Sequence, residues 1–157
     1  MKKIIFFFLF SLFAFSQNTN ANGIDFDMPA EVSNAFSQQF PNAKKVNWNR
    51  VYRSLDNSSQ ERFEVTFKMN KSNYLVSYIK DGTVKAIEKS LKPSQLPDQI
   101  LSYLQTNYPT FKIQEASEVA LENGDTNIEI GLQDDAGFSV AVFDKNNDFL
   151  FIKQSED

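Results

Sequence analysis

The chain contains no cysteine and no histidine among its 157 residues. Without cysteine it can form no disulfide, no thiolate metal site and no thiol nucleophile, so its stability must come from the packed core. Without histidine it lacks the usual general base, the commonest zinc ligand and the base of Ser–His pairs. Glycine-rich phosphate loops and Gly-x-Ser-x-Gly motifs are missing as well. We therefore expect no enzyme activity, no cofactor and no metal site.

Long basic runs are also missing. The chain carries 16 Lys and Arg against 20 Asp and Glu, a net charge of −4. Without Lys2 and Lys3, which precede an apolar run, 14 basic residues remain against 20 acidic ones, a net charge of −6. Nucleic acids and anionic membranes are bound through clusters of Lys and Arg. The composition therefore argues against both as partners.

The N-terminal segment has the pattern of a secretory signal peptide. Two lysines precede about a dozen apolar residues, and the run closes on a small-x-small sequence at Ser16. A membrane-spanning helix needs roughly 20 apolar residues, so this run is too short to be one. A buried N-terminal helix is the alternative, but the run has no polar face. We expect cleavage, a periplasmic or secreted location, and no lipid anchor because no cysteine follows.

After this segment the sequence nearly repeats itself. Met28–Pro41 returns as Leu96–Pro109, with proline matching proline at both ends and apolar residues at matching helical spacings. The strand-like Phe63–Phe67 likewise corresponds to Ile128–Leu132. The predicted divisions of the chain are residues 1–16 for the signal peptide, 17–27 for a polar leader, 28–92 for the first unit and 93–157 for the second.

Period-2 alternation predicts four strands in each unit. They cover residues 46–52, 62–69, 74–79 and 84–87, and then 113–121, 128–133, 138–143 and 149–152. The fold class predicted is α+β, with two tandem repeats, each one helix followed by a four-stranded antiparallel sheet. Whether the two sheets merge into one is left open.

One part of this pattern resembles a known family. Phe40-Pro41-Asn42-Ala43, then Val46-x-Trp48, alternating strands and an Asp-Gly hairpin resemble the PepSY-like family of small exported bacterial proteins. The resemblance spans about residues 28–152. That family is related in fold to the secreted beta-lactamase inhibitor protein, which is also a tandem repeat of helix-plus-four-strand units. The resemblance implies export and a protein-binding or inhibitory role.

The second copy departs from the family pattern. Tyr108-Pro109-Thr110-Phe111 lacks both the alanine and the downstream tryptophan. The two disulfides of the inhibitor have no counterpart in a chain without cysteine. Inhibition of a beta-lactamase is therefore not carried over.

The predicted function rests on the sheet. If Phe63, Val65 and Phe67 face the helix, the residues that alternate with them form an outer face of mixed polar and apolar character. Such a face is typical of a binding surface or of a second packed layer, although an ordinary solvated face is the alternative. We predict a non-enzymatic module that occludes part of another envelope or secreted protein. The predicted partner-binding residues are Asn47, Asn49, Glu64, Thr66, Lys68, Leu75, Ile79, Glu129 and Gln133.

Two further functions stay open. A sensor or binder of a small ligand or cation would have a polar pocket between the units. An enzyme that uses carboxylates alone would have two acids about 5–10 Å apart in a cleft.

Two motifs have simpler interpretations. Asp144-x-Asn146-x-Asp148 has the opening spacing of a calcium loop, but Phe149 stands where that loop needs glycine, so we interpret it as a hairpin turn. We assign Trp48 to packing because it shares an alternation face with Val46.

Overall fold

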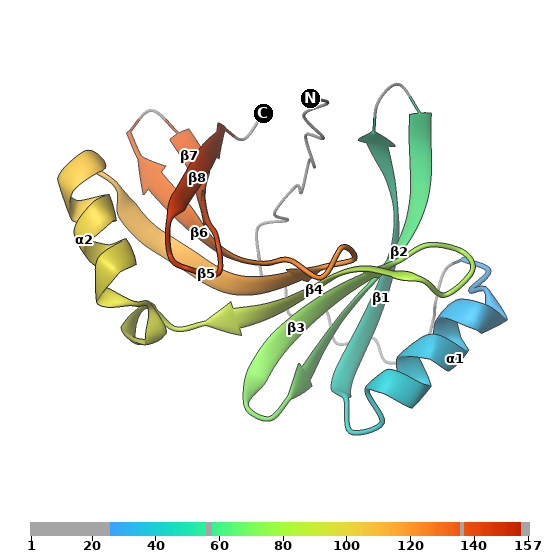
Figure 1. Cartoon of the computed structure of the whole chain (residues 1–157). Coiled ribbons are helices and arrows are strands. Elements are labelled where there is room, and N and C mark those ends of the chain that lie inside the picture. Colours follow the sequence, from blue (N-terminus) through green and yellow to red (C-terminus); the bar gives the residue numbers. More distant parts are fainter. Residues whose placement is uncertain (1–25, 56–57, 136, 155–157) are drawn as a thin grey trace.

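The computed structural model describes residues 26–55, 58–135 and 137–154, and in this part of the chain it has an α+β fold (Figure 1). The predicted signal peptide and most of the predicted leader lie outside the described residues. The elements in chain order are α1 (Ala30–Gln39), β1 (Lys44–Leu55), β2 (Ser58–Met69), β3 (Ser72–Tyr78), β4 (Val84–Leu91), the 3-10 turn η1 (Pro93–Gln95), α2 (Asp98–Asn107), β5 (Lys112–Leu121), β6 (Thr126–Asp134), β7 (Gly137–Phe143) and β8 (Phe149–Gln154).

All eight strands form one antiparallel sheet in the order β1 to β8. The question left open by the sequence is thereby answered: the four strands of each half belong to one continuous sheet. β4 and β5 pair directly, from Ala86 opposite Leu121 to Leu91 opposite Ala116. An unpaired strand edge exposes backbone donors and acceptors, and this pairing satisfies the edges that two separate sheets would leave open.

Both helices cover the same face of the sheet. Residues directly opposite each other on neighbouring strands share a face. One such row runs from Phe67 on β2 through Tyr74, Lys89 and Glu118 to Ile128 on β6. Phe67 packs in the cluster under α1, and Ile128 packs against the cluster under α2. The sheet is bent, and the two helices lie on its outer side (Figure 1).

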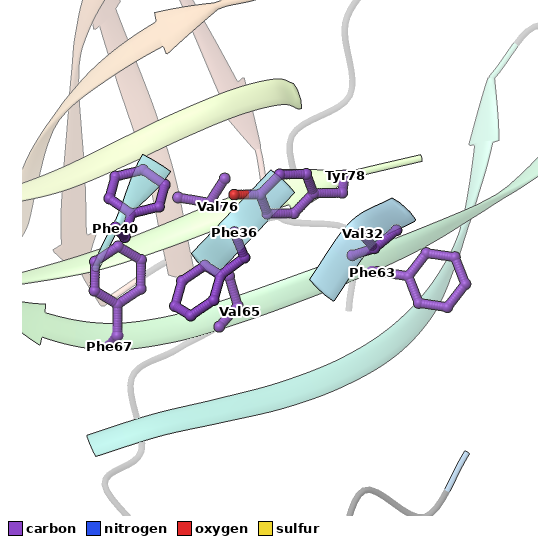
Figure 2. Packing of buried hydrophobic residues seen from close by; sticks show 8 residues of the cluster. All are labelled: Val32, Phe36, Phe40, Phe63, Val65, Phe67, Val76 and Tyr78. Carbon is purple, nitrogen blue, oxygen red and sulfur yellow. The ribbon is translucent and has the colours of Figure 1, made fainter. Parts of the chain in front are cut away.

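The first core cluster joins α1 to β2 and β3. Val32, Phe36 and Phe40 lie on one side of α1, and Val32 is fully buried. The rings of Phe36 and Phe40 lie 5.3 and 4.8 Å from the ring of Phe67 (Figure 2). Fully burying an apolar side chain stabilises the fold by about 1.5–3 kcal/mol, so this stripe holds α1 on the sheet.

The second core cluster repeats the arrangement with different side chains. Ile100 and Leu104 of α2 are buried with Ile130, Leu132 and Phe143 of the sheet. An aromatic layer lies beside them, formed by the stacked rings of Tyr103 and Phe149, whose centroids are 4.9 Å apart.

The two helices begin and end with the same backbone geometry. The N-cap prolines, Pro29 and Pro97, have φ −59° with ψ 136° and 142°. At the other end, Phe40 and Tyr108 have φ −127° and −135° with ψ 58° and 55°. No side chain caps either N-terminus. Proline suits this position because its φ is already that of the helix start.

A bulge near the start of β1 changes one prediction. Lys45 has φ 55°, and the register with β2 shifts between Lys44 and Asn47. Val46 is therefore 42% exposed instead of sharing the inner face with Trp48. Trp48 still points to the helix, and its ring meets Phe36 edge-on at 5.2 Å, as the packing interpretation predicted.

Candidate binding face

The side of the sheet that faces away from both helices carries the candidate site, and we call it the free face. Its side chains alternate with those of the two core clusters. Rows of cross-strand partners define it, for example Asn47, Thr66, Leu75, Glu88 and Val119 on β1 to β5. A second row crosses the other half and consists of Ser90, Ser117, Glu129, Val142 and Phe151.

The predicted partner-binding residues lie on this face but differ in exposure. Asn47, Asn49 and Lys68 are exposed. Thr66, Ile79 and Gln133 are half-buried, and Ile79 lies just beyond the end of β3. Their role in binding stays a prediction.

Three of the predicted residues have little exposed surface. Glu64, Leu75 and Glu129 are 6%, 7% and 3% exposed, although alternation alone directs them away from the helices. Neighbouring strands lie about 4.8 Å apart, so flanking side chains on a bent sheet shield those between them. A binding partner can therefore contact the exposed residues of this face directly, but not these three.

An ion pair links two strands of the second half. The Lys153 Nζ atom on β8 lies 3.1 and 3.3 Å from the two carboxylate oxygens of Glu129 on β6. The same ammonium lies 5.7 Å from the ring centre of Phe151. Charge-assisted hydrogen bonds of this kind are stronger than neutral ones. The pair therefore holds the Lys153 side chain over β7, which lies between β6 and β8 in the sheet.

A cavity of about 550 Å³ opens at the meeting of β3, β4, β5 and β6. Most of its lining residues belong to the free face, including Leu75, Glu88, Ser90, Glu115 and Ser117. This volume is in the range of small-molecule sites.

Two polar atoms in this lining are buried without a hydrogen-bond partner. They are Oε1 of Glu115 and Oγ of Ser117, and Ser117 is only 3% exposed. Burial raises the pKa of the Glu115 carboxyl from 4.5 to about 7, because a low-polarity environment disfavours the charged form. Ser90 differs, since its Oγ accepts a 3.1 Å hydrogen bond from the Asn73 backbone N–H.

Sequence reasoning named a pocket between the units only as the mark of an alternative function, and it missed Glu115. Simple alternation along residues 113–121 puts Glu115 on the same side as the apolar Ile113. A register shift between Ile113 and Glu115 breaks that alternation, so Ile113 stays with the core beneath α2 while Glu115 turns to the free face. A bulge leaves no strong signal in a single sequence.

The calcium-like spacing forms the turn between β7 and β8. Asp144 Oδ1 accepts hydrogen bonds from the backbone N–H groups of Asn146 at 2.8 Å and Asp148 at 2.9 Å. These bonds hold the pKa of Asp144 below its usual range. Within the described part of the chain, no group of three or more carboxylates converges as a metal site would require.

Comparisons with known proteins find solved structures with a similar fold. No family model and no curated protein matches the chain. A DUF2874 family protein from Bacteroides ovatus superposes with a TM-score of 0.68 at 16% identity, over 82% of this chain and 89% of that chain. A BLIP-like protein from Bacteroides fragilis superposes with a TM-score of 0.65 at 13% identity, over 84% and 91%.

A third solved structure comes from Bacteroides eggerthii and is named as a candidate periplasmic protein. Its TM-score is 0.67 at 14% identity, over 82% of this chain and 90% of that chain. Identities this low show likeness of fold alone, so the chain has a BLIP-like α+β fold. Among residues 26–55, 58–135 and 137–154, neither helix is long and apolar enough to cross a membrane.

Proposed function

We propose that this chain is an exported, non-enzymatic protein-binding module that occludes part of another envelope or secreted protein with its free face. One observation carries the proposal: both helices cover one side of the sheet, so among the described residues no helix lies on the other side. That side combines exposed polar residues such as Asn47 and Lys68 with the exposed ring of Phe151, beside the buried side chains of Leu75 and Val140. Interfaces combine apolar anchors with a polar rim in this way.

The location in the proposal rests on two supports. The N-terminal sequence has the pattern of a cleavable signal peptide, and a protein of similar fold carries the word periplasmic in its name. The PepSY-like resemblance of residues 40–48 points in the same direction.

The proposal also includes a duplicated architecture of one helix and four strands in each half. The order of elements, the paired prolines and the matching backbone angles at both ends of α1 and α2 support it. Unrelated helices share such a set of angles only by coincidence, whereas copies of one unit retain it.

A pull-down with matched variants tests the binding function. The bait is the chain from Gln17, exposed to envelope and secreted extract, with captured proteins identified by mass spectrometry. One variant carries Asn47→Arg and Asn49→Arg on the free face. The control carries Gln38→Arg and Gln39→Arg on exposed positions of α1, so both variants add the same charge.

The expected result is a protein captured by the wild type and by the α1 control but not by the free-face variant. Large charged side chains in an interface core disrupt its packing and desolvation. If both variants lose the captured protein equally, or if both retain it, the free face is not the binding surface.

The second candidate function is binding of a small ligand, and the cavity favours it. A site of about 550 Å³ with two unpartnered polar atoms has the size and the sparse polar lining of a ligand pocket. A thermal-shift screen of cations and metabolites tests it, with stabilisation by one chemical class as the expected outcome.

A further inference from the structure

The charge of the cavity gives the first indication of its ligand. Glu88 and Glu115 line it, whereas no lysine or arginine does so among the described residues. The remaining lining is made of neutral polar side chains such as Ser117 and Gln133, and of apolar ones such as Phe138. An acidic site with apolar walls attracts a cation that also carries an apolar part.

The two unpartnered atoms indicate which chemical group a ligand of this cavity would carry. Oε1 of Glu115 and Oγ of Ser117 are both buried, and both can accept a hydrogen bond. Buried polar atoms in folded proteins almost always have a partner. A ligand that brings N–H donors would supply one to each of them.

Gly131 explains how Glu115 reaches this position. It lies opposite Glu115 on β6, and a Cβ atom there would sit 2.7 Å from Cγ of Glu115 and 2.7 Å from Cζ of Phe138. Any larger residue would force these side chains away from that position. Glycine therefore lets the carboxyl of Glu115 and the ring of Phe138 lie side by side over the strand.

A carboxylate beside an aromatic ring is a combination that suits organic cations. The carboxylate accepts N–H donors, and an aromatic ring attracts a cation through its electron-rich face. Calcium sites gather several acidic oxygen ligands, and among the described residues no three carboxylates converge, either here or elsewhere.

We propose that this cavity binds an organic cation, an ammonium or guanidinium group on an apolar stem. Glu115 accepts its N–H donors, Ser117 offers a second acceptor, and Phe138 covers the stem. The inference rests on the proposed function only in that the cavity opens on the free face. The probe described below is a free small molecule, so failure to capture a protein partner and failure to bind the cation are separate results.

The ionisation of Glu115 provides a signature. Its pKa of about 7 means that the carboxyl is largely neutral near pH 6 and largely charged near pH 8. The ionisable neighbours are Glu88 on β4 and, along β6, Glu129, which is paired with Lys153. Gly131 on β6 lies opposite Glu115, and Val140 and Phe138 on β7 lie beside Gly131; none of the three carries a charge.

The test is a titration with butylguanidinium followed by backbone amide chemical shifts, with neutral butylurea and calcium chloride as comparison probes. We expect butylguanidinium to shift the amides of β5 and β6 around the cavity and to bind about tenfold more tightly near pH 8 than near pH 6. Butylurea, which has the same shape without the charge, should bind at least about tenfold more weakly.

Three variants make the test specific. Glu115→Gln should lower the affinity about tenfold or more and remove its pH dependence. Ser117→Ala should lower the affinity severalfold and keep the pH dependence. Glu118→Gln removes the same charge from an exposed position of β5 on the opposite face and should change neither.

The proposal is overturned by any of four results, of which three concern butylguanidinium and its variants. These are equal binding of butylurea, equal loss of affinity in Glu118→Gln, or no amide shifts with butylguanidinium at millimolar concentration. Tighter binding of calcium chloride than of butylguanidinium would also overturn it, in favour of a metal site.

Discussion

Two side chains, Tyr78 and Glu115, each carry a buried polar atom without a hydrogen-bond partner. The hydroxyl of Tyr78 is buried without a hydrogen-bond partner among the rings beneath α1, and this burial raises its pKa (Figure 2). Glu115 is the corresponding case on the free face. Each such group costs about 1–3 kcal/mol of stability relative to a satisfied one. Tyr78 belongs to the core cluster, whereas Glu115 lines a cavity, so only the second has space for a ligand.

Glu115 makes the free energy of unfolding depend on pH. Its carboxyl has a pKa of about 7 in the folded protein and an ordinary value of 4.5. Below about pH 4.5 it is protonated in both states. Between about pH 4.5 and 7 the unfolded chain releases the proton while the folded chain retains it, so stability falls as the pH rises.

We predict that Glu115→Gln is about 1 kcal/mol more stable than the wild type at pH 8 and nearly equal to it at pH 4.5. The full pKa shift of Glu115 would correspond to a larger change in the free energy of unfolding, but partial hydration of the side chain reduces the effect. Urea unfolding at the two pH values measures it. A stability difference that does not change with pH would contradict the raised pKa.

At the scale of elements, three hairpins of the sheet use one turn design. In the β3–β4 turn, Ile79 N–H donates to Thr83 O and Gly82 N–H donates to Ile79 O, both at 3.0 Å. The β5–β6 turn repeats these bonds at 2.9 and 3.0 Å around Gly124. The β7–β8 turn repeats them with Asn147 at φ 68° in the glycine position. Glycine and asparagine tolerate this left-handed conformation better than other residues.

Close packing against α1 also requires glycine at position 82. A Cβ atom there would lie 2.7 Å from the backbone oxygen of Glu31 in α1, whereas a Cβ atom on Gly124 would meet nothing within 4 Å. The φ angles of the two glycines are nearly equal, at 84° and 86°. The β3–β4 turn therefore fits directly against the first turn of α1, while the β5–β6 turn is open.

We predict that Gly82→Ala lowers the free energy of unfolding by about 2–3 kcal/mol and Gly124→Ala by about 1 kcal/mol. Both changes introduce backbone strain of about 1–2 kcal/mol, but only the first displaces α1. Chemical denaturation of the two variants compares them. Equal losses would show that the turn does not support the helix.

At the scale of the whole molecule, the continuous sheet joins the two core clusters. β4 and β5 share a ladder from Ala86 to Leu91, and the row that contains Lys89 and Glu118 connects one cluster to the other. Breaking one cluster exposes one side of that ladder. We therefore expect the two halves to unfold together, as small domains usually do.

Trp48 makes this expectation measurable, because it is the only tryptophan and lies in the first cluster. We predict that Ile130→Ala, in the second cluster, lowers the stability reported by Trp48 fluorescence by about 2–4 kcal/mol, the usual cost of such a truncation in a core. Val65→Ala, in the first cluster, serves as the matched comparison. A fluorescence transition that Val65→Ala moves and Ile130→Ala does not would show that the halves unfold independently.

Much of the local structure could be predicted from the sequence. The apolar stripe of Val32 and Phe36, the proline at each helix boundary and the alternation of Phe63, Val65 and Phe67 predict elements that the structure contains. The α+β class is confirmed by these elements. Exposure was less predictable: Val46 is exposed because of a bulge, and Glu64 and Leu75 are shielded by their neighbours.

The sequence by itself therefore determined the helices, the strands and, on a regular strand such as β2, the side that meets a helix, because these follow from periods of 3.6 and 2 residues within one segment. Only the tertiary structure decided that the strands form one sheet, that both helices lie on the same side, and that Glu115 and Ser117 line a cavity on the other. These features depend on the pairing of β4 with β5 and on a register shift in β5. Backbone hydrogen bonds between distant segments set both, and backbone groups are the same in every residue except proline.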